Sequence, residues 1–333
     1  MGIVAQRRGL VFFAVPPNQG YEMTFALSRS TVRSAATAEQ PKLRTTRLRW
    51  LLLLLLLALP AAVAAVRFVQ SSIVHALEAE AIEPKAIGVE RPESFGVPSQ
   101  DMLIPVAQRV VQARIVRAEQ SQAPAVLIFH GNGEALSDWS EVQAMLYRAG
   151  VTSLVFDYSG FGNSTGKPGV ESMRADALAA YAMLVRLTPR AERRLLLGHS
   201  LGNAVMLDAL DDLRPAPTGV VVHAAFTSAR EYAVSSGLVS PIVARLLPDL
   251  WDNEEAISRS GSPVLIVHGI NDEVIPVAMG RRLAVAAGSR ATLMAVADDS
   301  HDEIYLGPSS KDWGPIMDFI APQAIAGPDG SAH

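Results

Sequence analysis

A serine between two glycines is the strongest candidate nucleophile in this sequence. Gly198, Ser200 and Gly202 form a G-x-S-x-G motif, which follows the apolar run 194–197 and precedes a helical pattern at 201–210. Where a buried strand turns sharply into a helix, glycines let the backbone segments approach closely and leave the serine Oγ exposed at the tip of the turn. We therefore predict that Ser200 is the nucleophile of a covalent reaction.

A nucleophilic serine needs a base that accepts its proton, and the late histidines are the candidates. Only His301 and His333 follow the region in which the carboxylate partner is expected. His333 is the last residue, on a glycine- and proline-containing tail that we expect to be disordered. His301 lies on a polar loop directly after the last predicted strand. We therefore predict that His301 is the base for Ser200.

A carboxylate must hold that histidine in the correct tautomer, and two neighbouring acids compete for the role. Asp272 and Glu273 lie after the strand predicted at 264–267, between His268 and Pro276. In a fold whose chain order is serine, acid, histidine, this is the expected place for the acid. Three aspartates close to the base in sequence are expected to form a solvated loop: Asp298, Asp299 and Asp302.

Short apolar runs alternate with helical patterns from residue 101 onward. The runs are typical of strands in a mainly parallel sheet, and they lie at 102–106, 109–117, 125–129, 153–156, 194–197, 219–222, 264–267 and 292–296. Helical spacing predicts helices at 139–148, 171–187, 201–210, 277–287 and 311–320. Active sites collect beyond the carboxyl ends of such strands, so we expect the polar residues that follow the strands to lie together.

Four ordered motifs make residues 100–322 resemble the alpha/beta-hydrolase superfamily. They read HGNG from residue 130, DYSGFGNSTG from residue 157, GHSLG from residue 198 and PVLIVHGINDEVIP from residue 263. More narrowly, they resemble the membrane-anchored abhydrolase-domain serine hydrolases, although one extra residue separates PVL from HG. The resemblance implies an α/β fold with a mainly parallel central sheet, flanking helices and a short helical cap. It also selects Asp272 over Glu273 as the acid.

The negative charge that develops on an attacked carbonyl group needs preorganised N–H donors. In this fold, one donor is the backbone N–H of the residue after the nucleophile, which is Leu201 here. The resemblance implies that the second is the N–H of Asn132 in HGNG, with Gly131 as the alternative. It further implies a serine hydrolase that cleaves carboxylic esters or thioesters, with small-molecule or lipid-like substrates. An acyltransferase, a peptidase on the same triad and a catalytically silent scaffold are the alternatives.

Composition excludes several other functions. The 333 residues contain no cysteine, which excludes disulfides, thiolate metal sites and cysteine nucleophiles. The net charge is −4, but residues 1–49 carry eight basic and two acidic side chains, so the rest of the chain carries −10 and offers no basic face to nucleic acid. The glycine-rich stretch 160–168 fails both nucleotide-loop patterns, and no spacing suits zinc, so we predict neither cofactor nor metal.

An uncharged apolar segment precedes the hydrolase region. Residues 50–66 lack charged side chains, and with Arg67 at the headgroups the span reaches residue 69, which is long enough for a membrane-crossing helix. Because basic residues dominate before this segment, the positive-inside rule places the later domain on the non-cytoplasmic side of the membrane. A cleaved signal peptide is the alternative, since residues 62–64 read Ala-Val-Ala and form a cleavage motif.

These features divide the chain into five parts. They are a disordered basic segment at 1–49, a transmembrane or signal-anchor helix at 50–69, a polar linker at 70–100, the hydrolase domain at 101–322 and a disordered tail at 323–333. The cap is expected at about 225–262, where apolar residues recur at helical spacing between residues 238 and 251. That apolar face would line an acyl groove, contact a membrane or pack on the sheet.

Overall fold

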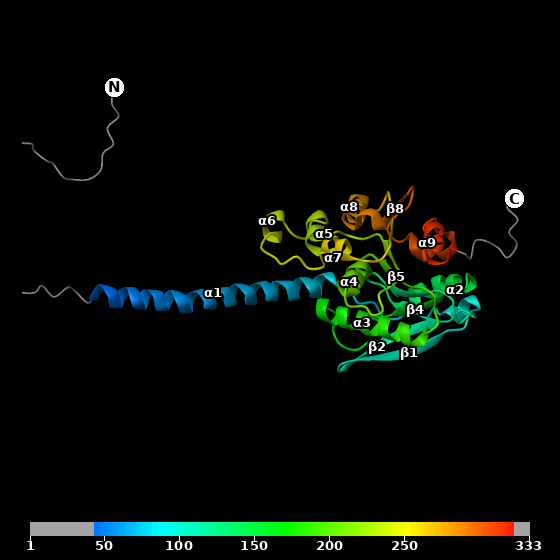
Figure 1. Cartoon of the computed structure of the whole chain (residues 1–333), viewed down its shortest axis with the longest axis horizontal. Helices are drawn as coiled ribbons and strands as arrows, with labels where there is room; N and C mark the ends of the chain where they lie inside the picture. The colour runs from blue at the N-terminus through cyan, green and yellow to red at the C-terminus, as the bar shows by residue number, and fades with distance from the viewer. Residues whose placement is uncertain (1–42, 323–333) are drawn as a thin grey trace, which may run out of the picture. The chain divides into compact units, whose positions relative to one another are not determined.

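The computed structural model describes residues 43–322, which fall into two compact parts divided after Ala58. The first part holds the N-terminal turns of α1 (Leu43–Ala81), and the second holds the sheet, the other helices and the candidate site (Figure 1). The predictions for residues 1–42 and for the tail 323–333, which includes His333, lie outside the described residues.

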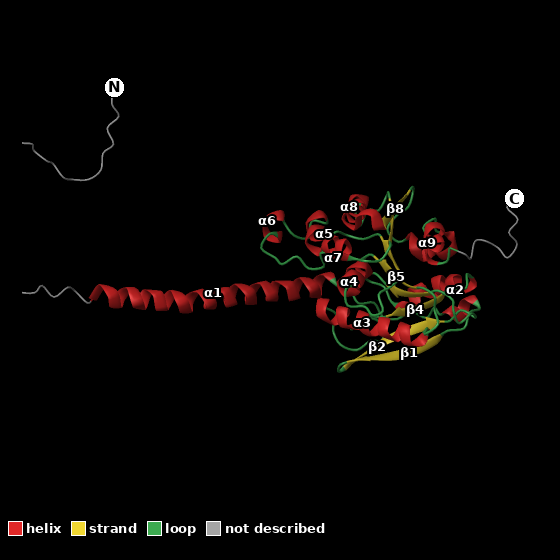
Figure 2. Ribbon diagram, viewed as in Figure 1, coloured by secondary structure: helices red, strands yellow, loops and turns green. Residues whose placement is uncertain are grey.

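An eight-stranded sheet forms the centre of the second part (Figure 2). Its order is β1-β2-β4-β3-β5-β6-β7-β8; the pairs β1·β2 and β2·β4 are antiparallel and all other pairs are parallel. The strands are β1 (Gln100–Val106), β2 (Arg109–Val116), β3 (Ala125–Phe129), β4 (Thr152–Phe156), β5 (Arg194–His199), β6 (Gly219–His223), β7 (Val264–Gly269) and β8 (Ala291–Val296). The predicted mainly parallel sheet is confirmed.

The central strands are apolar because both faces of the sheet are covered. Every residue of β3, β6 and β7 is buried, and in β5 only Arg194 is partly exposed. One face packs on α3, α4, α7 and α8, and the other packs on α2 and α9. These helices are α2 (Ser140–Arg148), α3 (Val170–Leu187), α4 (Leu201–Leu210), α7 (Asn253–Arg259), α8 (Val277–Ala287) and α9 (Trp313–Ile320). The carboxyl ends of the parallel strands therefore meet at one edge.

Truncation of Leu196 to alanine is expected to lower the free energy of unfolding by about 2–5 kcal/mol. Leu196 is fully buried in β5, where it pairs with Leu127 of β3 and Val220 of β6. A cavity between covered faces cannot close without moving these strands. Val285→Ala, at an 81% exposed position of α8, is the control and should change the same free energy by less than about 0.5 kcal/mol. Urea titration measures both; equal losses would contradict a close-packed sheet core.

The apolar N-terminal segment lies within α1, a helix of 39 residues that contains Pro60. This helix extends beyond the predicted range 50–69 at both ends. Between residues 43 and 322, however, no helix is both long and apolar enough to cross a membrane. The predicted transmembrane span is therefore not supported, and the orientation and the cleaved-signal alternative stay predictions.

The segment expected as a polar linker packs on the sheet domain. After α1, the described chain contains only one short helix before β1, the 3-10 helix η1 (Pro92–Phe95). Ile82 and Val97 are nevertheless buried, and the backbone N–H of Glu83 donates to Oδ1 of Asn132 at 2.8 Å. Residues 82–99 are therefore not an unattached linker, because apolar side chains and backbone groups of this segment contact the domain.

The cap differs from the single helical face that the sequence predicts. Before α7 it consists of α5 (Ala229–Ser235) and the one-turn helix α6 (Pro241–Ala244). Leu238, Ile242 and Leu246 are 63%, 77% and 67% exposed. The apolar residues of this stretch do not form one face on the sheet, because two prolines interrupt the helical pattern and no continuous helix carries it.

Candidate active site

The turn between β5 and α4 places Ser200 at the carboxyl edge of the sheet. Ser200 has φ 50° and ψ −120°, a backbone conformation that residues with a Cβ rarely adopt. Its N–H donates to the carbonyl of His223 at 3.1 Å. The side-chain amide of Asn203 donates to the carbonyls of Ser200 and His223 at 3.1 and 2.7 Å. These bonds hold the strained strand-to-helix turn in place.

The glycines of the motif are required by close approach of backbone and side-chain atoms. A Cβ on Gly202 would lie 2.1 Å from the carbonyl oxygen of Phe129 and 2.7 Å from that of His130. A Cβ on Gly198 would lie 2.6 Å from Oδ1 of Asn203 and 2.9 Å from its Cα. Any side chain at position 202 would therefore push α4 away from the end of β3.

Three side chains from three different strand ends form a hydrogen-bonded chain. Oγ of Ser200 lies 3.0 Å from Nε2 of His301, and Nδ1 of His301 lies 2.8 Å from Oδ2 of Asp272. Ser200 follows β5, Asp272 follows β7 and His301 follows β8. Such an arrangement lets the imidazole accept the hydroxyl proton while the carboxylate selects its tautomer. The structure thus brings together the three residues that the sequence predicts as nucleophile, acid and base.

Hydrogen bonds to both oxygens hold Asp272 in one orientation. Oδ1 accepts the backbone N–H groups of Val274 and Ile275 at 2.9 and 2.7 Å, and Nε2 of His268 lies 3.3 Å from Oδ2. Burial raises the pKa of Asp272, but the hydrogen bonds with His268 and His301 outweigh it and hold that pKa well below its usual range. Asp272 is therefore ionised throughout the neutral pH range.

The other acidic candidates differ in burial. Glu273 and Asp298 are exposed, and the side chain of Asp302 is 75% exposed. Asp299 is fully buried, and burial together with the neighbouring carboxyl group of Asp312 raises its pKa to about 9. The prediction of a solvated loop is therefore wrong for Asp299, because the loop after β8 packs against the end of β7.

The predicted oxyanion donors belong to two segments. Leu201 is the first residue of α4, where backbone N–H groups lack acceptors within the helix. Asn132 lies in the loop after β3, and this loop is tied to Glu83 through the Asn132 side chain. The carboxyl group of Glu134 lies against Gly131, since a Cβ there would lie 2.1 Å from Oε1 of Glu134. The assignment of Asn132 as the second donor, with Gly131 as the alternative, stays a prediction.

A second buried chain, which the sequence does not predict, lies beside the first. Nδ1 of His199 lies 2.9 Å from Nδ1 of His223, whose Nε2 lies 2.9 Å from Oδ2 of Asp312. The His199 ring is 5.1 Å from the His301 ring, and its Nε2 is 3.5 Å from Oε1 of Glu134. All of these except Glu134 and His301 are fully buried. No motif marks Asp312, although Glu134 directly follows HGNG.

Within residues 43–322, two sets of three side chains are close enough to share a cation. They are His199, His301 and Asp302, and His223, Asp299 and Asp312. In each set one histidine already has both ring nitrogens in hydrogen bonds, His301 in the first and His223 in the second. A metal ion would have to break one of the two chains to gain that ligand. The sequence prediction of no metal stays a prediction.

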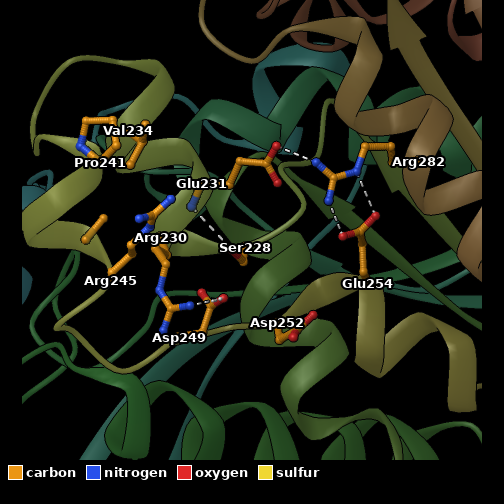
Figure 3. A pocket seen from close by; sticks show the side chains of 11 residues that line it. Ser228, Arg230, Glu231, Val234, Pro241, Arg245, Asp249, Asp252, Glu254 and Arg282 are labelled. Atoms are coloured by element: carbon orange, nitrogen blue, oxygen red, sulfur yellow. Dashed lines mark hydrogen bonds and ion pairs between the residues drawn. The ribbon is translucent and has the colours of Figure 1, made fainter.

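A polar cavity of about 290 Å³ lies between the cap and α8 (Figure 3). Arg230 and Asp249 pair across it at 3.3 Å, and Arg282 pairs with both Glu231 and Glu254. None of the three residues of the serine chain lines this cavity. The pairs of Arg282 therefore connect the cap to α8, whereas the pair of Arg230 and Asp249 lies within the cap.

Comparisons with known proteins agree with this architecture. A family model described as serine aminopeptidase, S33, matches residues 120–261. An uncharacterised protein of Mycobacterium tuberculosis is 29% identical over 247 residues, which cover 71% of this chain and 87% of that protein. The lysophosphatidylserine lipase ABHD12 of Danio rerio is 30% identical over 194 residues, which cover 52% of this chain and 50% of that protein.

Solved structures show the same fold. The Pyrococcus furiosus esterase Pf2001 has a TM-score of 0.59 and 16% identity, and the match covers 73% of this chain and 98% of that chain. Likeness at this level of identity concerns the fold alone. The sheet order and the strand-to-helix serine turn are those of the alpha/beta-hydrolase superfamily, and the named relatives make the chain similar to its abhydrolase-domain branch.

Proposed function

We propose that this protein is a serine hydrolase that cleaves carboxylic esters or thioesters through an acyl-enzyme at Ser200. The observation that carries the proposal is the hydrogen-bonded chain from Ser200 through His301 to Asp272, with contacts of 3.0 and 2.8 Å. The similarity to a protein named as a lysophosphatidylserine lipase supports an ester substrate. Small-molecule and lipid-like esters are the substrate classes that follow from it.

The reaction uses the contacts of the site in order. Oγ of Ser200 attacks the substrate carbonyl carbon while Nε2 of His301 accepts its proton, and ionised Asp272 stabilises the imidazolium that forms. The N–H groups of Leu201 and Asn132 stabilise the oxyanion. His301 then gives its proton to the departing alcohol or thiol, and a water molecule, activated by the same histidine, releases the acid and restores the serine.

An amide is the second candidate substrate, because the matching family model is described as a serine aminopeptidase. The same acyl-enzyme would serve a peptidase, and attack by an alcohol in place of water would make the protein an acyltransferase. A silent scaffold is disfavoured, since packing alone does not require an ionised aspartate, a histidine and a strained serine in one hydrogen-bonded chain.

Labelling with a fluorophosphonate probe is expected to modify the wild type and to leave Ser200→Ala without label. The probe reacts with an activated serine hydroxyl, and Ser200 is the serine whose Oγ bonds to His301. Ser258→Ala is the control, because Ser258 is exposed on α7 and its Oγ bonds only a nearby carbonyl, that of Glu255. Full labelling of Ser200→Ala would contradict the proposal. A panel of esters, thioesters and amides then separates the candidate reactions.

A further inference from the structure

Glu134, His199, His223 and Asp312 form a buried chain. The N–H and O–H donors along this chain can all point toward only one of its ends at a time. Each neutral imidazole has one N–H donor and one acceptor nitrogen. If Nε2 of His223 donates to Asp312, then Nδ1 of His223 must accept the N–H of Nδ1 of His199. Nε2 of His199 is then left without a proton. It then needs a donor. Within the described residues it has no hydrogen-bond partner, and Oε1 of Glu134, at 3.5 Å, is nearer to it than the carboxylate of Asp302 at 3.9 Å.

When both imidazoles are neutral, the charges of the two carboxyl groups at the ends favour this direction. Burial raises the pKa of Asp312, but the hydrogen bond from His223 outweighs it and the net shift is downward. Burial raises the pKa of Glu134 to about 8, and burial lowers the pKa of His199 well below its usual range. At pH 7 the chain therefore begins at an ionised Asp312 and ends at a neutral Glu134.

Glu134 also holds the loop after β3. Nε1 of Trp139 donates to Oε2 of Glu134 at 3.0 Å. A Cβ on Gly131 would lie 2.1 Å from Oε1 of Glu134, so the carboxyl group and the loop are in direct contact. Asn132, the proposed second oxyanion donor, is the next residue of this loop.

We propose that Glu134 positions the oxyanion loop, residues 130–133, by acting as the neutral, donating end of the buried chain. The role rests on the serine hydrolysis proposed above. The carboxyl O–H donates to Nε2 of His199, and Oε2 accepts the N–H of Trp139. An ionised Glu134 would lose the bond to His199 and would place a negative charge beside the loop that stabilises the oxyanion.

The groups that face Glu134 determine the pH at which its carboxyl group ionises. Asp138, in the 3-10 helix η2 (Leu136–Trp139), and Asp302, which precedes the 3-10 helix η4 (Glu303–Ser309), add negative charge that favours the neutral acid. His199, and Tyr158 after β4, are neutral at pH 7, since burial lowers the pKa of the first and raises that of the second. Ionisation of Glu134 should therefore produce an alkaline loss of activity near pH 8.

The test compares the full-length wild type with Glu134→Gln and Glu134→Ala. Glutamine reproduces the neutral acid, because its NH₂ donates to His199 and its oxygen accepts from Trp139, but it does not ionise. We expect wild-type kcat/KM on an activated ester to fall about tenfold per pH unit above pH 8, and Glu134→Gln to stay within about threefold of its pH 7 value up to about pH 9. Glu134→Ala should lose at least about tenfold at pH 7.

Asp302→Asn is the matched control for the pH profile. Its carboxylate faces the same nitrogen of His199, at 3.9 Å, but is exposed to solvent. This variant should keep the alkaline loss and move it slightly to lower pH, because one negative charge near Glu134 is removed. An alkaline loss that persists unchanged in Glu134→Gln would overturn the positioning role.

Thermal unfolding tests the protonation state of Glu134 independently of catalysis. A glutamate in the unfolded chain ionises near its ordinary pKa of 4.5, whereas folded Glu134 ionises near 8, so rising pH favours the unfolded state between these values. The Tm of Glu134→Gln should therefore rise relative to the wild type from pH 5 to pH 8.

If the wild type neither hydrolyses esters nor reacts with the serine probe, both the proposed function and the positioning role of Glu134 are contradicted. The Tm difference still tests whether Glu134 is a neutral buried acid. If that difference is absent, Glu134 does not act as the donor at the end of the buried chain.

Discussion

Replacement of His301 by alanine is expected to lower kcat on an ester by about 10⁴- to 10⁶-fold while the folded structure persists. Nε2 of His301 lies 3.0 Å from Oγ of Ser200, so without it the hydroxyl lacks the base that accepts its proton. Asp272→Asn should cost about 10⁴-fold, because an amide in place of the carboxylate favours the wrong imidazole tautomer. Steady-state kinetics measures kcat, and thermal unfolding verifies that each variant is folded.

The double variant Ser200→Ala, His301→Ala distinguishes a shared mechanism from independent roles. The two groups act in one step, so their joint loss should be no larger than that of Ser200→Ala alone. Asp298→Asn is the control; it changes an exposed acid in the loop that carries His301, at φ 57°, where asparagine is tolerated. It should alter kcat by less than about twofold. If the loss of kcat in the double variant equalled the product of the two single losses, Ser200 and His301 would not act in one step.

Gly202→Ala is expected to have the largest effect on folding, with a loss of at least about 3 kcal/mol in the free energy of unfolding. The new Cβ would lie 2.1 Å from the carbonyl oxygen of Phe129 and 2.6 Å from its carbonyl carbon. Both are backbone atoms of β3, and β3 is paired with β4 and β5 on its two sides. β3 therefore cannot move away from the new Cβ, so α4 and the loop after β3 must shift instead. Urea titration measures the loss.

Gly314→Ala provides a matched control for that prediction. Gly202 and Gly314 are each the second residue of a helix, α4 and α9, but a Cβ on Gly314 would meet nothing within 4 Å. Alanine is the better helix former, so this variant should be neutral or more stable by up to about 1 kcal/mol. Similar losses in the two variants would show that helix propensity, and not the contact with β3, explains the motif glycine.

The secondary structure is predicted well because local patterns carry it. β3 runs over residues 125–129 and α4 over residues 201–210, as the apolar run and the helical spacing indicate. The cap was predicted less well, because its apolar residues suit a helix while two prolines prevent one from forming across them. Residues 82–99 have a polar composition, and only their contacts with the domain show that they pack on it.

In the candidate site, too, some residues are predicted from local motifs and others are not. Ser200, Asp272 and His301 are predicted from motifs that sit at strand ends, and the structure brings their side chains within hydrogen-bond distance, while their catalytic roles stay predictions. Asp299 could not be predicted correctly, since three aspartates within five residues read as a solvated loop. Its burial follows from how the loop packs against β7, which no local pattern records.

By itself the sequence determined the order of strands and helices and placed the candidate serine, acids and histidine at strand ends, because hydrophobic periodicity and glycine spacing are local properties. The choice of Asp272 over Glu273 came from the family resemblance. Only the tertiary structure brought Glu134, His199, His223 and Asp312 together. These residues come from four separate segments; hydrogen bonds join His199 to His223 and His223 to Asp312, and Glu134 lies 3.5 Å from His199. Burial and contact between distant segments arise when the sheet and its helices come together, so no single stretch of residues encodes them.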